Sequence, residues 1–437
     1  MAGLSDMSTF QLVLMGVFGG AAVLAIGIFA MGGLDDDSKA TVKLSLWGTL
    51  DEDVAQNWIE TALPEGSNIG VDYKEIRSDD FDQKLLRAVA TDSGPDMVMI
   101  SQDQIAEHQD IIRSIPFEKF PEREFRDSFV QAGEVFMNKE EKKHYGLPVL
   151  VDPLVMYWNR FQVREAGYTR PPRQWANFGD FVTDVVDKEL NKIDRAAVAL
   201  GEYENIKHSK AVLSTLIYQA GGKIISGDLG YQNEELSKDF GHSIMPAVSS
   251  LLFYTDFSDK DRSVYTWNRE MPSSFRSFTD EDLTVYFGLT SDFAKIRDVN
   301  PYLDFDVSVV PENDEGEVFS YSEVSGLSVL RSSSDPAACF SAMQALTSPN
   351  ALEKLSDDLQ GVPPSRNDLL ARPPQEPFHL PVFYEAAKRS LSWIDPSPEN
   401  TAKILKDMVL NVVDKEQEVE KAVSRAASRL RSMLKNL

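Results

Sequence analysis

The sequence predicts an α/β protein with a parallel sheet, divided into two domains or lobes. Strand and helix patterns alternate from residue 41 to residue 100, and this order implies a parallel sheet with right-handed crossovers. The length of 437 residues can supply two units with their own cores. The single cysteine, Cys339, allows no internal disulfide, so we expect packing to hold the fold and Cys339 to be a buried thiol.

The first unit opens with an alternating strand at 41–47. Val42, Leu44 and Leu46 share one face of this pattern, which is typical of a half-buried strand. In parallel sheets ligands bind beyond the carboxyl ends of the strands, so the residues after each strand are candidates for a binding site. The elements predicted next are a helix at 51–62, a strand at 69–76, a helix that starts near Ser78 and a buried strand at 97–100.

The second unit, from about 152 to 303, also mixes helices and strands. Helical patterns lie at 175–186 and 209–220, and Gly221-Gly222 should end the latter as a glycine C-cap. The elements predicted after this unit are a strand at 305–310, a helix at 336–356 with Pro336 in its first turn, and a helical C-terminus at 401–437.

An apolar segment at 12–34 precedes both units. Its 23 consecutive positions carry no charged side chain, and about 20 apolar residues span a hydrocarbon core as a helix. The run is too long for a signal-peptide core and no Lys or Arg precedes it. These features favour a retained anchor over a signal cleaved near Ala30-Met31-Gly32. We expect a tail at 1–11, a single-pass anchor in the cell membrane, a linker at 35–40 and an extracytoplasmic body.

The composition argues against several classes of function. The formal net charge is −25, from 69 acidic and 44 basic residues, so we expect no binding of nucleic acid or anionic lipid by the folded body. The five histidines show no metal-ligand spacing, and no P-loop, GxSxG or strand-flanked GxGxxG occurs. We expect no catalysis, no metal and no cofactor. The enzyme alternative is a glycoside hydrolase, which needs two carboxylates about 5–10 Å apart.

Several short motifs follow one another along the chain. They are Leu46-Trp47-Gly48, Ser93-Gly94-Pro95-Asp96-Met97-Val98, Tyr145-Gly146-Leu147-Pro148, Met156-Tyr157-Trp158-Asn159-Arg160 and Gly361-Val362-Pro363-Pro364-Ser365-Arg366. In this order and spacing they resemble the extracytoplasmic solute-binding proteins of ABC importers, in the branch that includes maltose- and other sugar-binding proteins. Gln174 and Asn177 depart from the family pattern, and the family's lipidated cysteine is absent.

The resemblance implies a two-lobed, type II periplasmic-binding-protein-like fold, whose discontinuous lobes close about a hinge. Lobe one would cover 41–149 and 305–362, and lobe two would cover 150–304 and 363–437. The resemblance also implies that the protein captures a small solute, with a carbohydrate expected, and delivers it to ABC permease subunits. The alternative function for the same fold is an anchored receptor or adhesion module that transports nothing.

Ligand contacts are expected where aromatic rings and polar groups meet in the cleft, because sugars present apolar ring faces and hydroxyls together. Some candidates follow strand ends or the hinge, and others lie in segments that resemble cleft-facing segments of the family. The candidate residues are Trp47, Gln102, Asp103, Asp152, Tyr157, Trp267, Tyr286, Tyr321, Glu323 and Trp393.

Most of these candidates have a structural alternative. Trp47 suits core packing equally well, and the polar pair after the strand at 97–100 suits an exposed loop. Asp152 suits an Asx turn before Pro153. Tyr157 lies in a largely structural motif, where we expect a buried aromatic. Trp267 lies in a polar, loop-like stretch and is predicted to be exposed, which favours stacking on a ligand.

Overall fold

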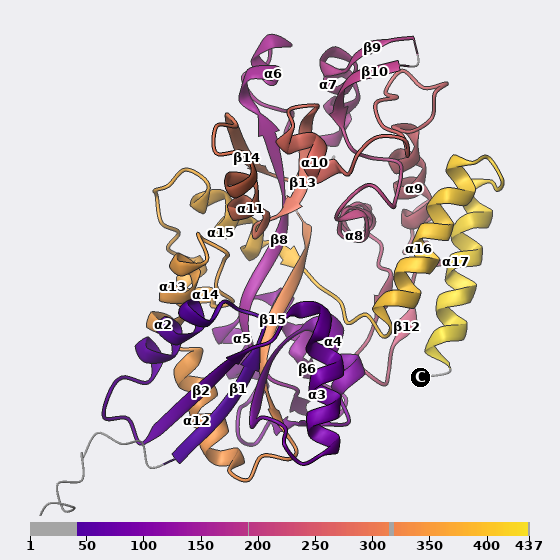
Figure 1. Cartoon of the computed structure of the whole chain (residues 1–437). Coiled ribbons are helices and arrows are strands. Elements are labelled where there is room, and N and C mark those ends of the chain that lie inside the picture. The colour runs from indigo at the N-terminus through magenta and orange to yellow at the C-terminus, as the bar shows by residue number, and fades with distance from the viewer. Residues whose placement is uncertain (1–41, 191, 314–318, 436–437) are drawn as a thin grey trace, which may run out of the picture.

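The computed structural model describes residues 42–190, 192–313 and 319–435, which form two lobes (Figure 1). An eleven-stranded sheet runs through both lobes. Among the described residues, no helix is both long and apolar enough to cross a membrane. The predicted anchor at 12–34 lies outside these residues.

Lobe one, the lower lobe in Figure 1, is built on a parallel sheet. Strand β1 (Val42–Gly48) lies between β2 (Ile69–Glu75) and β3 (Met97–Ser101), and both pairings are parallel. The predicted parallel pairing of these strands is therefore confirmed, and Leu44 and Leu46 are buried as expected. The main helices of this lobe are α2 (Glu52–Ala62), α3 (Phe81–Ala90), α4 (Gln102–His108), α12 (Pro336–Leu346) and α13 (Pro349–Asp358).

Two predicted helices are each divided in the structure. The pattern at 336–356 forms α12 and α13, because Pro349 lacks an N–H and starts a new helix at its first position. The C-terminus forms α16 (Pro398–Val413) and α17 (Val419–Leu434), which lie side by side (Figure 1). Cys339 in α12 is fully buried, as predicted.

Two long strands cross between the lobes. Strand β8 (Leu147–Asn159) pairs antiparallel with β15 (Ser320–Leu330) through its first half. Its second half pairs with β13 (Leu283–Leu289) and β14 (Phe305–Val309) in lobe two. The chain passes between the lobes a third time after β16 (Ser390–Leu391), which pairs with the start of β15 and leads to α16. We call residues 392–397 the third crossover.

Lobe two continues the sheet from β8 through β13 to β10 (Lys192–Val198) and β9 (Asp187–Glu189). Strand β14 also pairs with the lobe-two half of β8. The lobe limits remain a proposal, and this pairing favours a boundary within β15 over the one proposed at 305. The helices between β8 and β14 are α6 (Arg160–Glu165), α7 (Phe178–Val185), α8 (Ser209–Gln219), α9 (Pro246–Asp256), α10 (Ser274–Thr279) and α11 (Asp292–Val299).

Short elements complete the two lobes. The short strands are β4 (Ile112–Arg113), β5 (Ile115–Pro116), β6 (Met137–Asn138), β7 (Lys143–His144), β11 (Ile225–Ser226) and β12 (Asn233–Glu234). The remaining helices are α5 (Glu122–Ser128), α14 (Asn367–Leu370) and α15 (Leu380–Lys388), and 3-10 turns lie at η2 (Ser78–Asp80), η3 (Gln131–Phe136) and η4 (Trp175–Asn177).

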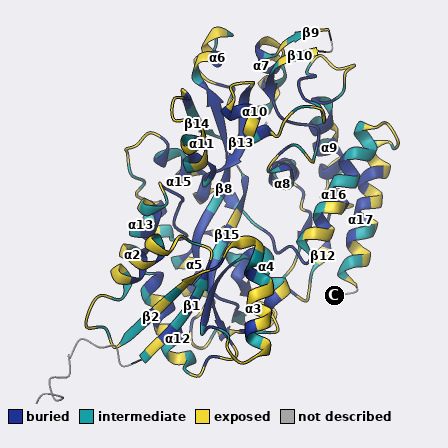
Figure 2. Cartoon of the chain, viewed as in Figure 1, coloured by how far each residue is buried: buried dark blue, intermediate teal, exposed yellow. Residues whose placement is uncertain are grey.

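The buried residues follow the sheet through both lobes (Figure 2). Helix α8 is buried along most of its length and ends at a glycine, as predicted. Gly221 has a φ of 82°, and the Gly222 N–H donates to the carbonyl of Ile217 at 2.8 Å. This C-terminal motif needs a residue in the left-handed backbone conformation, which glycine adopts without strain. It turns the chain away at Gly221, three residues after Tyr218.

Candidate functional site

The crossing strands bring two carboxylates together. Asp152 on β8 lies opposite Glu323 on β15, and opposed residues place their side chains on the same face of a sheet. Oδ1 of Asp152 accepts hydrogen bonds from Thr290 Oγ1 (2.6 Å) and the Ser291 N–H (3.0 Å). Among the described residues, no side chain or backbone group donates to the Glu323 carboxylate or forms an ion pair with it.

The surroundings of both carboxylates raise their pKa values. Glu323 is open to solvent, but the protein around its carboxylate desolvates it, and this effect together with the charge of Asp152 raises the pKa of Glu323 to about 7. Burial also raises the pKa of Asp152, although hydrogen bonds from Thr290 and Ser291 oppose this. Neighbouring carboxylates disfavour each other's ionisation, so Glu323 can carry a proton near neutral pH.

Gln102 ties lobe one to β15 at the crossing. Ser101 and Gln104 form a capping box that starts α4 directly after β3. Gln102 is only 1% exposed, donates from Nε2 to Tyr321 Oη at 2.7 Å, and accepts from the Val324 N–H at Oε1. Strand β15 pairs with β16 at its start and with β3 further along. The bonds of Gln102 hold the part of β15 that lies between these two pairings.

Lys210 joins the two lobes through ion pairs. Its Nζ, in the first turn of α8, lies 3.0 Å from Oδ2 of Asp103 in lobe one and 2.6 Å from Oδ2 of Asp395 in the third crossover. Burial alone would lower the pKa of Lys210, but the two carboxylates raise it, so the lysine stays charged. Burial raises the pKa of Asp103 despite Lys210, and Oδ1 of Asp103 is buried without a hydrogen-bond partner.

A second ion cluster centres on Asp292, which is fully buried at the start of α11. Its carboxylate lies 2.6 Å from Lys207 Nζ and 2.7 Å from His208 Nε2, and it accepts from Tyr286 Oη at 2.6 Å. Burial would raise the pKa of Asp292, but His208 and Lys207 hold it well below its usual range. The carboxylate is therefore ionised and already saturated with protein donors, so this cluster has a structural role.

Six of the ten predicted residues gather around the crossing strands. Five of them take part in the contacts just described, and Trp393 joins them because its ring centroid lies 4.9 Å from Lys210 Nζ. The six residues are Gln102, Asp103, Asp152, Tyr321, Glu323 and Trp393.

Three other candidates lie in the core of lobe two. The prediction that Trp267 is exposed is wrong: its side chain is 0% exposed and its Nε1 donates to Asn205 Oδ1 at 3.1 Å. Tyr157 and Tyr286 are also fully buried, and their hydroxyls bond within the protein. The burial of Tyr157 agrees with the expectation of a buried aromatic there and favours the structural alternative for its motif. None of the three leaves a ring face open to a ligand in this structure.

The tenth candidate, Trp47, is not among the described contacts of Lys210. It is half-buried and packs against the core, which favours the alternative of core packing. Lys74, its neighbour across β1 and β2, places its ammonium 4.5 Å from the centroid of the indole ring. That face of the ring is therefore covered by the protein's own cation.

Sequence reasoning missed Lys207, His208 and Lys210, which supply most of the cations of these clusters. Lys295 also lies 3.5 Å from Asp292. A signal for these three residues was present, because Lys210 lies in the first turn of the predicted helix at 209–220 and Lys207 and His208 directly precede it. Positive charges are disfavoured near the N-terminus of a helix, so a basic group there indicates carboxylate partners. The identity of those partners, Asp103, Asp292 and Asp395, depends on tertiary contacts.

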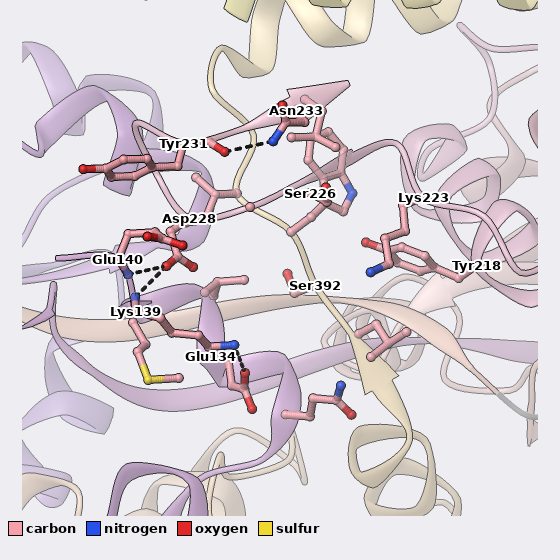
Figure 3. Close-up of a pocket in the computed structure, with 18 residues that line it drawn as sticks. Glu134, Lys139, Glu140, Tyr218, Lys223, Ser226, Asp228, Tyr231, Asn233 and Ser392 are labelled. Carbon is pink, nitrogen blue, oxygen red and sulfur yellow. Dashed lines mark hydrogen bonds and ion pairs between the residues drawn. The ribbon is translucent and has the colours of Figure 1, made fainter. Parts of the chain in front are cut away.

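A cavity of about 570 Å³ lies next to Trp393 (Figure 3). Its walls come from residues 131–140 of lobe one, residues 218–233 of lobe two and residues 391–394. Trp393 contributes to this cavity and also to the Lys210 cluster. It is the only predicted residue among those that line the cavity.

One group in the described part of the chain has the composition of a metal site. Potential ligand atoms of Asp82, Glu107 and His108 lie within 4.8 Å of one another. His108 Nε2 lies 2.7 Å from Oδ1 of Asp82, which also accepts from Gln104 Nε2 at 2.8 Å. The bond to His108 is the main reason that the pKa of Asp82 is lowered. These bonds join α3 to α4 without a metal, which favours a structural role.

Comparison with known proteins agrees with this architecture. Residues 58–379 match the model of a family described as bacterial extracellular solute-binding protein. A comparison with curated proteins finds no match.

Several solved structures share the fold over most of the chain. A cyclo/maltodextrin-binding protein in complex with maltotetraose aligns with a TM-score of 0.72 and 16% identity, over 92% of this chain and all of the other. The sugar-binding protein MalE of Xanthomonas citri aligns at 0.70 and 18%, over 90% of this chain and 98% of its own. An ABC transporter solute-binding protein of Thermotoga lettingae with α-D-tagatose bound aligns with a TM-score of 0.65 and 19% identity, over 90% of this chain and 99% of the other.

Proposed function

The chain belongs to the family of bacterial extracellular solute-binding proteins, and on this premise we propose that it captures a small carbohydrate between its lobes and delivers it to an ABC permease. An extracellular family implies that the folded body lies outside the cytoplasm. The carbohydrate is supported by the ligands of similar proteins, which include maltotetraose and α-D-tagatose. The proposed site comprises Gln102, Asp103, Asp152, Tyr321, Glu323 and Trp393.

The observation that carries this proposal is a set of free acceptors where the lobes meet. The Glu323 carboxylate and Oδ1 of Asp103 have no hydrogen-bond donor among the described residues. The nearby ammonium of Lys210 is already paired with two carboxylates. A solute for this site must therefore bring donors of its own, as sugar hydroxyls do. A carboxylated or phosphorylated solute would meet like charges.

The proposed mechanism is closure about β8, β15 and the third crossover. Asp103 belongs to lobe one, whereas Asp152 and Glu323 lie where the strands cross. A solute that touches both lobes only in the closed form shifts the population toward that form by its binding free energy. We propose that residues 12–34 anchor the protein near the permease, which raises the local concentration of loaded protein. The protein itself performs no reaction on the solute.

The test is isothermal titration of the full chain in detergent with maltotetraose, tagatose, and glucuronate as an anionic sugar. Neutral sugars should bind, and glucuronate should bind at least tenfold more weakly, which corresponds to about 1.4 kcal/mol. Asp152→Asn and Glu323→Gln should weaken sugar binding by roughly ten- to one-hundredfold. Glu124→Gln is a matched control, because Glu124 is exposed on α5 and has no ion pair in the described structure.

Other outcomes point to the alternatives. If no sugar binds to folded protein, the carbohydrate proposal is lost and an anchored receptor becomes the better hypothesis. If chromatography shows that maltotetraose is cleaved, the protein is a glycoside hydrolase. Equal binding of glucuronate and neutral sugars would contradict the role assigned to the free carboxylates.

A further inference from the structure

The cavity beside Trp393 shares only that residue with the carbohydrate site proposed above. Its volume of about 570 Å³ falls within the range of about 300–1,000 Å³ that is usual for small-molecule sites. Both lobes and the segment 391–394 contribute walls (Figure 3). Asp103, Asp152 and Glu323 do not line it, so it adjoins the proposed carbohydrate site at Trp393 and does not contain the carboxylates of that site.

Two charges that line this cavity are unpaired, and they have opposite signs. Lys223 follows α8 in lobe two, and Glu140 follows β6 in lobe one. Neither side chain forms a hydrogen bond or ion pair with any described residue. Figure 3 shows them on opposite sides of the cavity. The other charges nearby are engaged: Glu134 pairs with Lys139, and Asp228 accepts from the backbone N–H of Glu140.

Two hydroxyl groups of the cavity also lack partners. Ser392 Oγ is buried without a hydrogen bond, and the Tyr218 hydroxyl has none within the described residues. Burial raises the pKa of Tyr218, so its hydroxyl keeps its proton. In Figure 3, Tyr218 lies next to Lys223, and Ser392 lies nearer the middle of the cavity. The Lys223 side therefore offers an ammonium and two neutral donors.

We propose that this cavity is a second ligand site, which takes a short peptide with free termini. The C-terminal carboxylate of the peptide binds Lys223, Tyr218 and Ser392, and its N-terminal ammonium binds Glu140. A neutral sugar would leave both charges without a counter-ion, and a simple anion would satisfy only one of them. Apolar side chains of the peptide find an apolar lining in Val135, Met137, Ile225, Leu391 and Ile394.

Occupation of this site is linked to the hinge. The peptide joins a residue of lobe one to a residue of lobe two and touches the segment that leads from β16 to α16. A ligand that contacts both lobes favours the lobe arrangement in which those contacts are made. Peptide and carbohydrate therefore change each other's affinity by the same factor.

The test is titration of the full chain with the dipeptide Leu-Leu, its N-acetyl derivative and its C-terminal amide. Leu-Leu should bind, and each blocked form should bind about tenfold more weakly, since each loses one charged contact. In Lys223→Gln, Leu-Leu should bind about tenfold more weakly and amidation should have no further effect. In Glu140→Gln, acetylation should have no further effect.

Lys388→Gln and Glu124→Gln are matched controls and should retain wild-type affinity, because both side chains are exposed and lie outside this cavity. Thermal melts establish that each variant is folded. The proposal is overturned if Leu-Leu does not bind at millimolar concentration, or if it binds Lys223→Gln and Glu140→Gln as well as wild type. These results are independent of whether a sugar binds at the crossing strands.

Discussion

The ammonium of Lys210 lies 3.0 Å from the carboxylate of Asp103, and this ion pair connects helix α8 of lobe two with helix α4 of lobe one. The two residues are separated by 107 positions in the chain. Lys210 also pairs with Asp395, so a single ammonium holds both lobes and the third crossover in one arrangement. The lobe positions seen here therefore depend in part on this charge.

Removing the carboxylate of Asp103 should loosen the lobes without unfolding them. In Asp103→Asn the ammonium keeps Asp395 as its partner, so the main loss is the link across the lobes. Both side chains are partly exposed, and such pairs contribute about 0–1 kcal/mol. We expect a larger radius of gyration by small-angle X-ray scattering at nearly unchanged melting temperature. An unchanged radius, with Glu124→Gln as control, would show that other contacts hold the lobes together.

Asp395→Asn should instead destabilise the fold. Asp395 is 0% exposed, and Oδ1 accepts from Thr401 Oγ1 (2.7 Å) and the Ser397 N–H (3.0 Å) while Oδ2 pairs with Lys210. Breaking a buried ion pair costs about 3–5 kcal/mol. We expect a loss of that order in the free energy of unfolding, measured by urea denaturation.

A surface pair provides the control for Asp395. Asp407 pairs with Arg429 and is partly exposed, so Asp407→Asn should cost less than about 1 kcal/mol. Equal losses in the two variants would contradict the buried role assigned to Asp395.

Glu323 should make stability depend on pH. Its pKa is raised from 4.5 to about 7 in the folded protein, so between those values the folded state holds a proton that the unfolded state releases. Stability should therefore fall as pH rises through this window and change no further above it. In Glu323→Gln this contribution should disappear, so the melting temperature should fall less between pH 4.5 and 7. Identical pH profiles for the variant and wild type would contradict the raised pKa.

Trp267→Phe should affect stability and leave sugar binding unchanged. The indole is buried and donates to Asn205, so the substitution removes a hydrogen bond and leaves a small void, with an expected cost of about 1–3 kcal/mol. The dissociation constant for maltotetraose should stay within a factor of about two, because the buried indole offers no ring face to a ligand. A large loss of affinity in a variant of normal stability would restore Trp267 to the binding site.

The local pattern of the sequence predicted well what depends on neighbours along the chain. The alternation of Leu44 and Leu46 predicted β1, and the position of Gln102 after an apolar strand predicted its place at a strand end. Asp152 lies at the crossing because it falls between two of the motifs, within the long strand β8. Pro349 had the opposite effect, because a proline that begins a new helix divides a pattern that reads as continuous.

The long-range partners could not be predicted in this way. Trp267 lies in a polar stretch, and it is buried because Asn205 and the core of lobe two meet it there. Lys210 and Asp395 are separated by 185 positions and form one ion pair. With 69 acidic residues in the chain, the sequence offers many partners for each lysine and no means of choosing among them.

The sequence by itself determined the alternating elements, the acidic character and the order of motifs, because each depends on residue type and on spacing within a short stretch. The tertiary structure decided which aromatic rings are buried, which carboxylates are paired and which remain free between the lobes. Those properties depend on desolvation and on distances between atoms far apart in the chain, and both arise only when the two lobes and their crossing strands pack together.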